Sequence, residues 1–73
     1  MIAYVLLSIA PLIEHEIYLA LCRSNEVDEV FPLFGEYDII LKLTSDTKEG
    51  IGEIVERIKT MKGVLASKTL TGY

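Results

Sequence analysis

The sequence predicts an α+β fold of the ferredoxin-like type, with element order βαββαβ and a four-stranded antiparallel sheet. Apolar segments typical of strands occur at both ends and in the middle of the chain, and two stretches between them carry apolar residues at helical spacing. The connections are short and are marked by Pro11, Gly35 and Gly63. Right-handed crossovers and one tight hairpin then place both helices on one face of the sheet.

The first strand is predicted from Met1 to Ala10, a segment rich in β-branched and large apolar residues. Side chains alternate between the two faces of a strand. One face carries Ile2, Tyr4 and Leu6, and the other carries Ala3, Val5, Leu7 and Ile9. Both faces of this strand are therefore apolar.

Pro11 ends the strand and pre-sets the backbone for a helix from Leu12 to about Arg23. The apolar residues at helical spacing are Ile13, Ile17, Ala20 and Leu21. His15 and its acidic neighbours form a solvated helix face, because residues one apart point in different directions. Cys22 has no basic partner nearby and is expected to pack as a small hydrophobic residue.

The second strand is predicted from Glu26 to Phe34 and is interrupted by Pro32. Proline cannot donate to a strand ladder, so this strand belongs at a sheet edge or carries a bulge. Gly35 and Glu36 form a two-residue link into the third strand, Tyr37 to Ser45.

A second amphipathic helix follows, with Ser45 or Asp46 as its N-cap, and ends at Lys62 and Gly63. Its apolar residues are Ile51, Ile54, Val55, Ile58 and Met61. Gly50 and Gly52 weaken its first turn by about 1 kcal/mol each relative to alanine. The last strand is predicted from Val64 to Thr71.

The chain of 73 residues is one domain, 1–73, near the lower limit for an independent core. It is 51% hydrophobic, and its first and third strands are apolar on both faces. A central strand of this kind needs a second layer. The sequence therefore predicts a homodimer packed sheet against sheet, a dimeric α+β barrel.

The composition excludes several partner classes. The net charge is −4 and the seven basic residues are scattered, which argues against direct binding to nucleic acid. Met1 to Ala10 lacks a basic flank and is too short to span a bilayer, so we expect a cytoplasmic protein without membrane contact. One histidine and one cysteine cannot form a structural zinc site, and no metal or cofactor is expected.

The candidate ligand groups lie in the Gly35–Asp38 turn and at Ser67 and Thr69, two hydroxyls on one face of the last strand. A free amino acid needs donors for its carboxylate and an acceptor for its ammonium group. Backbone amides of the turn can donate, Asp38 can accept, and the hydroxyls can do either. The residues alone leave open the alternative that Gly35 and Asp38 only shape a turn.

Three segments resemble the effector-binding domain of the Lrp/AsnC transcriptional regulators, often called the RAM domain. They are the apolar strand Ala3–Leu6, the segment Gly35–Lys42, and Gly63-Val64 followed by Ser67 and Thr69. The resemblance covers essentially the whole chain. It implies amino-acid effectors bound between dimers, and a closed ring of dimers that is commonly an octamer.

By this resemblance, Gly35, Glu36, Tyr37 and Asp38 correspond to the ligand loop, and Ser67 and Thr69 to the hydroxyl pair of the final strand. The family's helix-turn-helix domain has no counterpart in these 73 residues. The chain is therefore expected to be a stand-alone version of the module, acting through full-length Lrp/AsnC regulators as partners.

Two other function classes remain as alternatives. One is a cofactor-free enzyme of the dimeric α+β barrel type, which shares this architecture. Such an enzyme needs a polar cavity, whereas the inward strand positions here are aliphatic and present no acid, base or nucleophile. The chain is therefore expected not to be an enzyme. The other alternative is a purely structural oligomerisation module.

Overall fold

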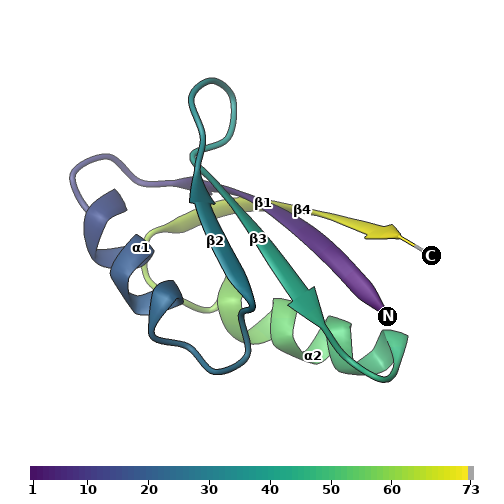
Figure 1. Ribbon diagram of the computed structural model, residues 1–73. Helices are drawn as coiled ribbons and strands as arrows, with labels where there is room; N and C mark the ends of the chain where they lie inside the picture. Colours follow the sequence, from purple (N-terminus) through teal and green to yellow (C-terminus); the bar gives the residue numbers. More distant parts are fainter. Residues whose placement is uncertain (73) are drawn as a thin grey trace.

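Four antiparallel strands form a sheet in the order β2-β3-β1-β4, and both helices cover one of its faces (Figure 1). This computed structural model describes residues 1–72, so Tyr73 of the predicted domain lies outside the described residues. The elements are β1 (Ile2–Ile9), α1 (Glu14–Cys22), β2 (Glu29–Pro32), β3 (Ile39–Thr44), α2 (Lys48–Lys59) and β4 (Val64–Gly72). The predicted ferredoxin-like βαββαβ fold is confirmed.

β1 lies in the interior of the sheet, between β3 and β4. Both pairings are antiparallel, and Val5 lies opposite Leu41 of β3 and opposite Thr69 of β4. Residues directly opposite one another in antiparallel strands have their side chains on the same face. The register therefore assigns each paired residue either to the face covered by helices or to the open face.

The core lies between the sheet and the helices, and alternate residues of β1 form its centre. Ala3, Val5 and Leu7 are fully buried, as the alternation of the strand predicted. The other buried residues are Ile9 of β1, Ile39, Leu41 and Leu43 of β3, Ile17 and Leu21 of α1, and Ile51, Ile54, Val55 and Ile58 of α2. Burial of each large aliphatic side chain stabilises the fold by about 1.5–3 kcal/mol.

The opposite, open face of the sheet carries apolar side chains from all four strands. They are Ile2, Tyr4 and Leu6 of β1, Phe31 of β2, Ile40 of β3 and Leu70 of β4. Tyr4 is 41% exposed and Phe31 is 53% exposed. Lys42 and Glu29 lie on this face as well, with Nζ 4.0 Å from Oε2. A contiguous apolar surface with a few charges is typical of a protein interface.

Helix α1 begins at Glu14, two residues later than the sequence predicted. Leu12 has a φ of 76°, in the left-handed region, and therefore cannot continue a right-handed helix. The prediction was wrong because Pro11 and Leu12 form a turn. The expectation for Cys22 was also wrong, because the last residue of α1 is exposed.

Strand β2 is shorter than predicted, because only Glu29–Pro32 pairs with β3. It does lie at a sheet edge, as expected for a strand that contains a proline. The prediction of a two-residue hairpin link at Gly35 and Glu36 was wrong, since residues 33–38 separate β2 from β3. The N-cap of α2 is Thr47, whose Oγ1 accepts a hydrogen bond from the Gly50 amide, rather than Ser45 or Asp46.

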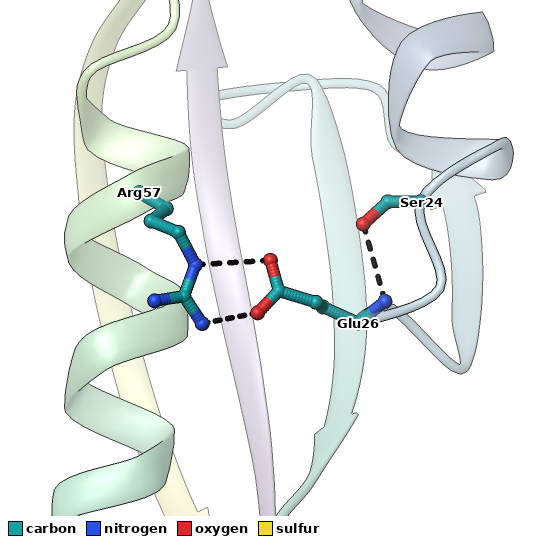
Figure 2. A network of polar contacts seen from close by, with 3 residues as sticks. All are labelled: Ser24, Glu26 and Arg57. Atoms are coloured by element: carbon teal, nitrogen blue, oxygen red, sulfur yellow. Dashed lines mark hydrogen bonds and ion pairs between the residues drawn. The ribbon is translucent and has the colours of Figure 1, made fainter.

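An ion pair joins α2 to the segment between α1 and β2 (Figure 2). Arg57 Nε donates to Glu26 Oε1 at 3.0 Å, and Arg57 Nη2 donates to Glu26 Oε2. The Glu26 amide in turn donates to Ser24 Oγ at 3.2 Å. The hydrogen bond from Arg57 is the main reason that the pKa of Glu26 lies below its ordinary value.

Candidate functional site

The Gly35–Asp38 segment belongs to a loop that projects beyond the end of the sheet (Figure 1). The Leu33 amide donates to the Asp38 carbonyl oxygen at 2.8 Å and closes the base of this loop. Gly35 has a φ of 123°, a conformation that strains any other residue type. Phe34 beside it is fully exposed. The shape of the loop tip therefore depends on a glycine.

Asp38 is fixed to the end of β1 by two hydrogen bonds. Its amide donates to the Leu7 carbonyl oxygen at 2.8 Å, and its carboxylate Oδ2 accepts from the Ile9 amide at 2.7 Å. The residue is half-buried. One carboxylate oxygen thus has a structural partner in the backbone, and the position of the other is set by the same anchoring.

Ser67 and Thr69 lie on one face of β4, opposite Leu7 and Val5 of β1. Leu7 and Val5 are core residues, so the two hydroxyls share the face that the helices cover. Ser67 is half-buried and Thr69 is exposed. The hydroxyl pair is therefore accessible from the outer edge of the sheet beside β4.

β1 separates the two parts of the sequence-predicted site. Leu7 bonds to Asp38 on one side and pairs with Ser67 on the other. Two strand spacings amount to about 10 Å. Within one protomer, the loop and the hydroxyl pair consequently do not meet.

A groove of about 500 Å³ lies between α1 and the end of the sheet where β2 and β3 are connected. Its lining residues are Glu14, His15 and Tyr18 of α1 and Pro32, Asp38 and Ile39 of the sheet and its loop. The pKa of Tyr18 is raised, mainly by a hydrogen bond with the side chain of Cys22 one turn later. Tyr18 therefore presents a neutral hydroxyl near neutral pH.

Sequence reasoning did not identify the α1 side of this groove. Glu14 and His15 are exposed, as predicted for a solvated helix face, and they also line the groove. One feature of the sequence did point to this side of the groove: Glu14 and Tyr18 are four residues apart and therefore share a helix face. That this face lies against Asp38 depends on tertiary packing, which no local pattern reveals.

Within residues 1–72, His, Cys, Asp and Glu form no group of three or more that could hold a metal ion. No helix in this range is both long and apolar enough to cross a membrane.

No family model and no curated protein matches the sequence. Among solved structures, FFRP-DM1 is 30% identical to this chain and has a TM-score of 0.91. The match covers 99% of this chain and 97% of that chain. The similarity therefore extends over both proteins almost completely.

Two longer proteins share the fold. AsnC from E. coli is 17% identical with a TM-score of 0.84, and the match covers 94% of this chain and 48% of that chain. The feast or famine regulatory protein from M. tuberculosis, complexed with L-methionine, is 18% identical with a TM-score of 0.69. That match covers 99% of this chain and 50% of that chain. This chain thus spans about half the length of both.

Proposed function

This chain belongs to the Lrp/AsnC family of transcriptional regulators, as a form of their effector-binding (RAM) domain, and from this premise we propose that it binds a free amino acid. One structure with the same fold holds L-methionine. Within this chain, the observation that supports the proposal most is the anchored position of Asp38 at the base of the projecting loop.

The loop offers the two kinds of group that a zwitterion requires. Among the hydrogen bonds of residues 1–72, none is donated by the amides of Gly35, Glu36 and Tyr37. These amides are therefore available to donate to a ligand carboxylate. Asp38 accepts a hydrogen bond from the ammonium group through the oxygen that the Ile9 amide does not occupy.

The proposed assembly explains why the site has two separate parts. The open apolar face pairs two copies sheet to sheet, and dimers then associate into a ring. Ser67 and Thr69 of a neighbouring dimer approach the loop of the first and complete the site between dimers. Any effect on transcription passes through full-length regulators of the family, with which this chain assembles.

Titration calorimetry with the twenty amino acids tests the proposal. Asp38→Asn is the informative variant, because the amide oxygen still accepts from the Ile9 amide while the negative charge is lost. A hydrogen bond to a charged group contributes about 1.5–3 kcal/mol, so affinity is expected to fall about 10- to 100-fold. Asp46→Asn, at an exposed position between β3 and α2, is the control of equal charge change.

Ser67→Ala is expected to weaken amino-acid binding as well. This effect should be seen only in the intact ring, because Ser67 is contributed by a neighbouring dimer. Equal affinities for the wild type and Asp38→Asn would remove Asp38 from the site. The absence of binding by any amino acid would leave the chain as a structural oligomerisation module, for which the open apolar face is the supporting feature.

A further inference from the structure

The groove between α1 and the β2–β3 connection forms a second candidate site, and we propose that it binds a small organic cation, an alkylammonium ion with a short aliphatic body. The groove is a different site from the amino-acid site on the loop. The two share Asp38, but the groove uses α1 and contains none of Gly35, Ser67 and Thr69.

The charges of the groove determine the sign of its ligand. Glu14 and Asp38 place two carboxylates in the lining, and no lysine or arginine is among the lining residues. Tyr18 adds no charge near neutral pH, because the pKa of its phenol is raised. Two negative charges attract a cation and repel the carboxylate of a zwitterion.

Asp38 is already held in position before a ligand binds. Its Oδ2 accepts from the Ile9 amide at 2.7 Å, and its own amide is bonded to β1. A group fixed in this way loses little conformational freedom when it contacts a ligand. Glu14 lies on the first turn of α1, so the two carboxylates come from two independently fixed elements.

The apolar part of the lining fits the body of such a ligand. Ile39, which is almost fully buried, and Pro32 supply apolar groups to the lining. The ring of Tyr18 adds an aromatic surface, which attracts cations as well as alkyl groups. The volume of about 500 Å³ lies within the range of small-molecule sites.

Amide chemical shifts measured by NMR test the proposal with three probes of equal length: n-butylammonium, butan-1-ol and butyrate. In the wild type, n-butylammonium is expected to give saturable shifts at the amides of Glu14, Tyr18 and Ile39. The alcohol and the anion are expected to give shifts at least several-fold smaller at the same concentration, because they lack the positive charge.

Glu14→Gln and Glu16→Gln form a matched pair of variants. Both remove one negative charge from the first turn of α1, but only Glu14 lines the groove. We expect Glu14→Gln to weaken n-butylammonium binding about fivefold, as loss of an exposed ion pair does. Glu16→Gln is expected to bind like the wild type.

A second experiment distinguishes a free alkylammonium ion from a lysine side chain of a partner protein. Nα-acetyl-lysine amide presents the same ammonium group as a lysine on a partner protein, so tighter binding than n-butylammonium indicates a peptide. Equal shifts with butan-1-ol, equal affinities in the two variants, or no localised shifts would each overturn the proposal. This test depends on Glu14 and not on the response to free amino acids, so its outcome is distinguishable from that of the amino-acid site.

Discussion

Gly63, between α2 and β4, is a position where one methyl group has a large expected effect. It has a φ of 105°, and a Cβ there would overlap Cδ1 of Ile13. We predict that Gly63→Ala lowers the free energy of unfolding by about 2–3 kcal/mol, from backbone strain and overpacking together. Urea denaturation at equilibrium measures the change.

Gly35→Ala is the matched control for the steric part of this effect. Gly35 also has a positive φ, 123°, but no atom lies within 4 Å of a Cβ built there. Only the strain remains, about 1 kcal/mol. Equal losses for Gly35→Ala and Gly63→Ala would show that Ile13 moves aside freely.

Glu26 makes stability depend on pH in a defined direction. Its pKa is lowered in the folded state, mainly by the hydrogen bond from Arg57, so its stabilising contribution is present above the unfolded-state pKa. That contribution is lost as the pH falls through the folded-state pKa. We predict that the wild type loses more stability than Glu26→Gln between pH 7 and pH 3.

Urea denaturation of the wild type, Glu26→Gln, Arg57→Gln and the double variant at both pH values tests this. Each single variant is expected to lack the part of the pH dependence that comes from the Glu26–Arg57 pair. The double variant is expected to show the same pH dependence as the single variants. A wild type and Glu26→Gln with parallel pH dependence would show that the ion pair does not persist in solution.

At the scale of the element, helix α2 contains a glycine whose replacement is expected to stabilise it. Gly52 is exposed, and no atom lies within 4 Å of a Cβ built there. Gly52→Ala should raise the free energy of unfolding by about 0.5–1 kcal/mol. Gly50→Ala is the contrast, because a Cβ at Gly50 would overlap Ser45 Oγ.

Thermal and urea denaturation of these two variants give the comparison. Both substitutions raise the helix propensity of α2 equally. Gly50→Ala is nevertheless expected to be less stable than Gly52→Ala, because only the Cβ at position 50 overlaps Ser45 Oγ. If the variants were equally stabilised, Ser45 would be rotating away without cost, and Gly50 would have no packing role.

The elements differ in how well local sequence predicted them. β1 and most of α2 were predicted correctly, because alternation along Ile2–Ile9 and the apolar stripe of Lys48–Lys59 are local patterns. The predicted end of α2 at Lys62 and Gly63 was wrong, since the helix ends at Lys59. The start of α1 and the extent of the β2–β3 loop were missed. Leu12 has a positive φ that its residue type does not indicate, and the loop is tied to β1 by the hydrogen bond from the Asp38 amide to Leu7, which is distant in sequence.

For the candidate site, the sequence suggested individual residues but not which of them lie close together. The alternation of the last strand correctly predicted one face for Ser67 and Thr69. Their separation from Asp38 by β1 follows from the strand order, and the groove beside α1 follows from helix packing. Tertiary arrangement, rather than residue type, therefore distinguishes the two candidate sites.

At the scale of the whole molecule, the open face should control the oligomeric state. Ile40 lies on this face, opposite Leu6 of β1 and Phe31 of β2. We predict that Ile40→Asp converts an oligomer into a monomer of 8.2 kDa, because an unpaired charge buried in an apolar interface is costly. Light scattering coupled to size-exclusion chromatography measures the mass.

Leu12→Asp is the control, since Leu12 is fully exposed in the turn after β1 and outside the open face. It is expected to keep the mass of the wild type. A wild type that is monomeric at micromolar concentration would contradict the proposed sheet-to-sheet dimer, whatever the variants do.

The pairing of the first and last strands brings the two ends of the described chain together. The N- and C-terminal ends lie at the same end of the sheet (Figure 1). Ile2 lies opposite Gly72, and the Met1 ammonium group donates to the Ser45 carbonyl oxygen at 2.9 Å. A short peptide joining the ends is therefore compatible with this topology, and the chain can be reopened in the projecting loop beside Gly35. In such a circular permutant, Asp38 keeps its own bonds to β1 while the loop tip becomes two free tails. Amino-acid binding by the loop should therefore require a continuous backbone through Gly35, whereas cation binding in the groove should not.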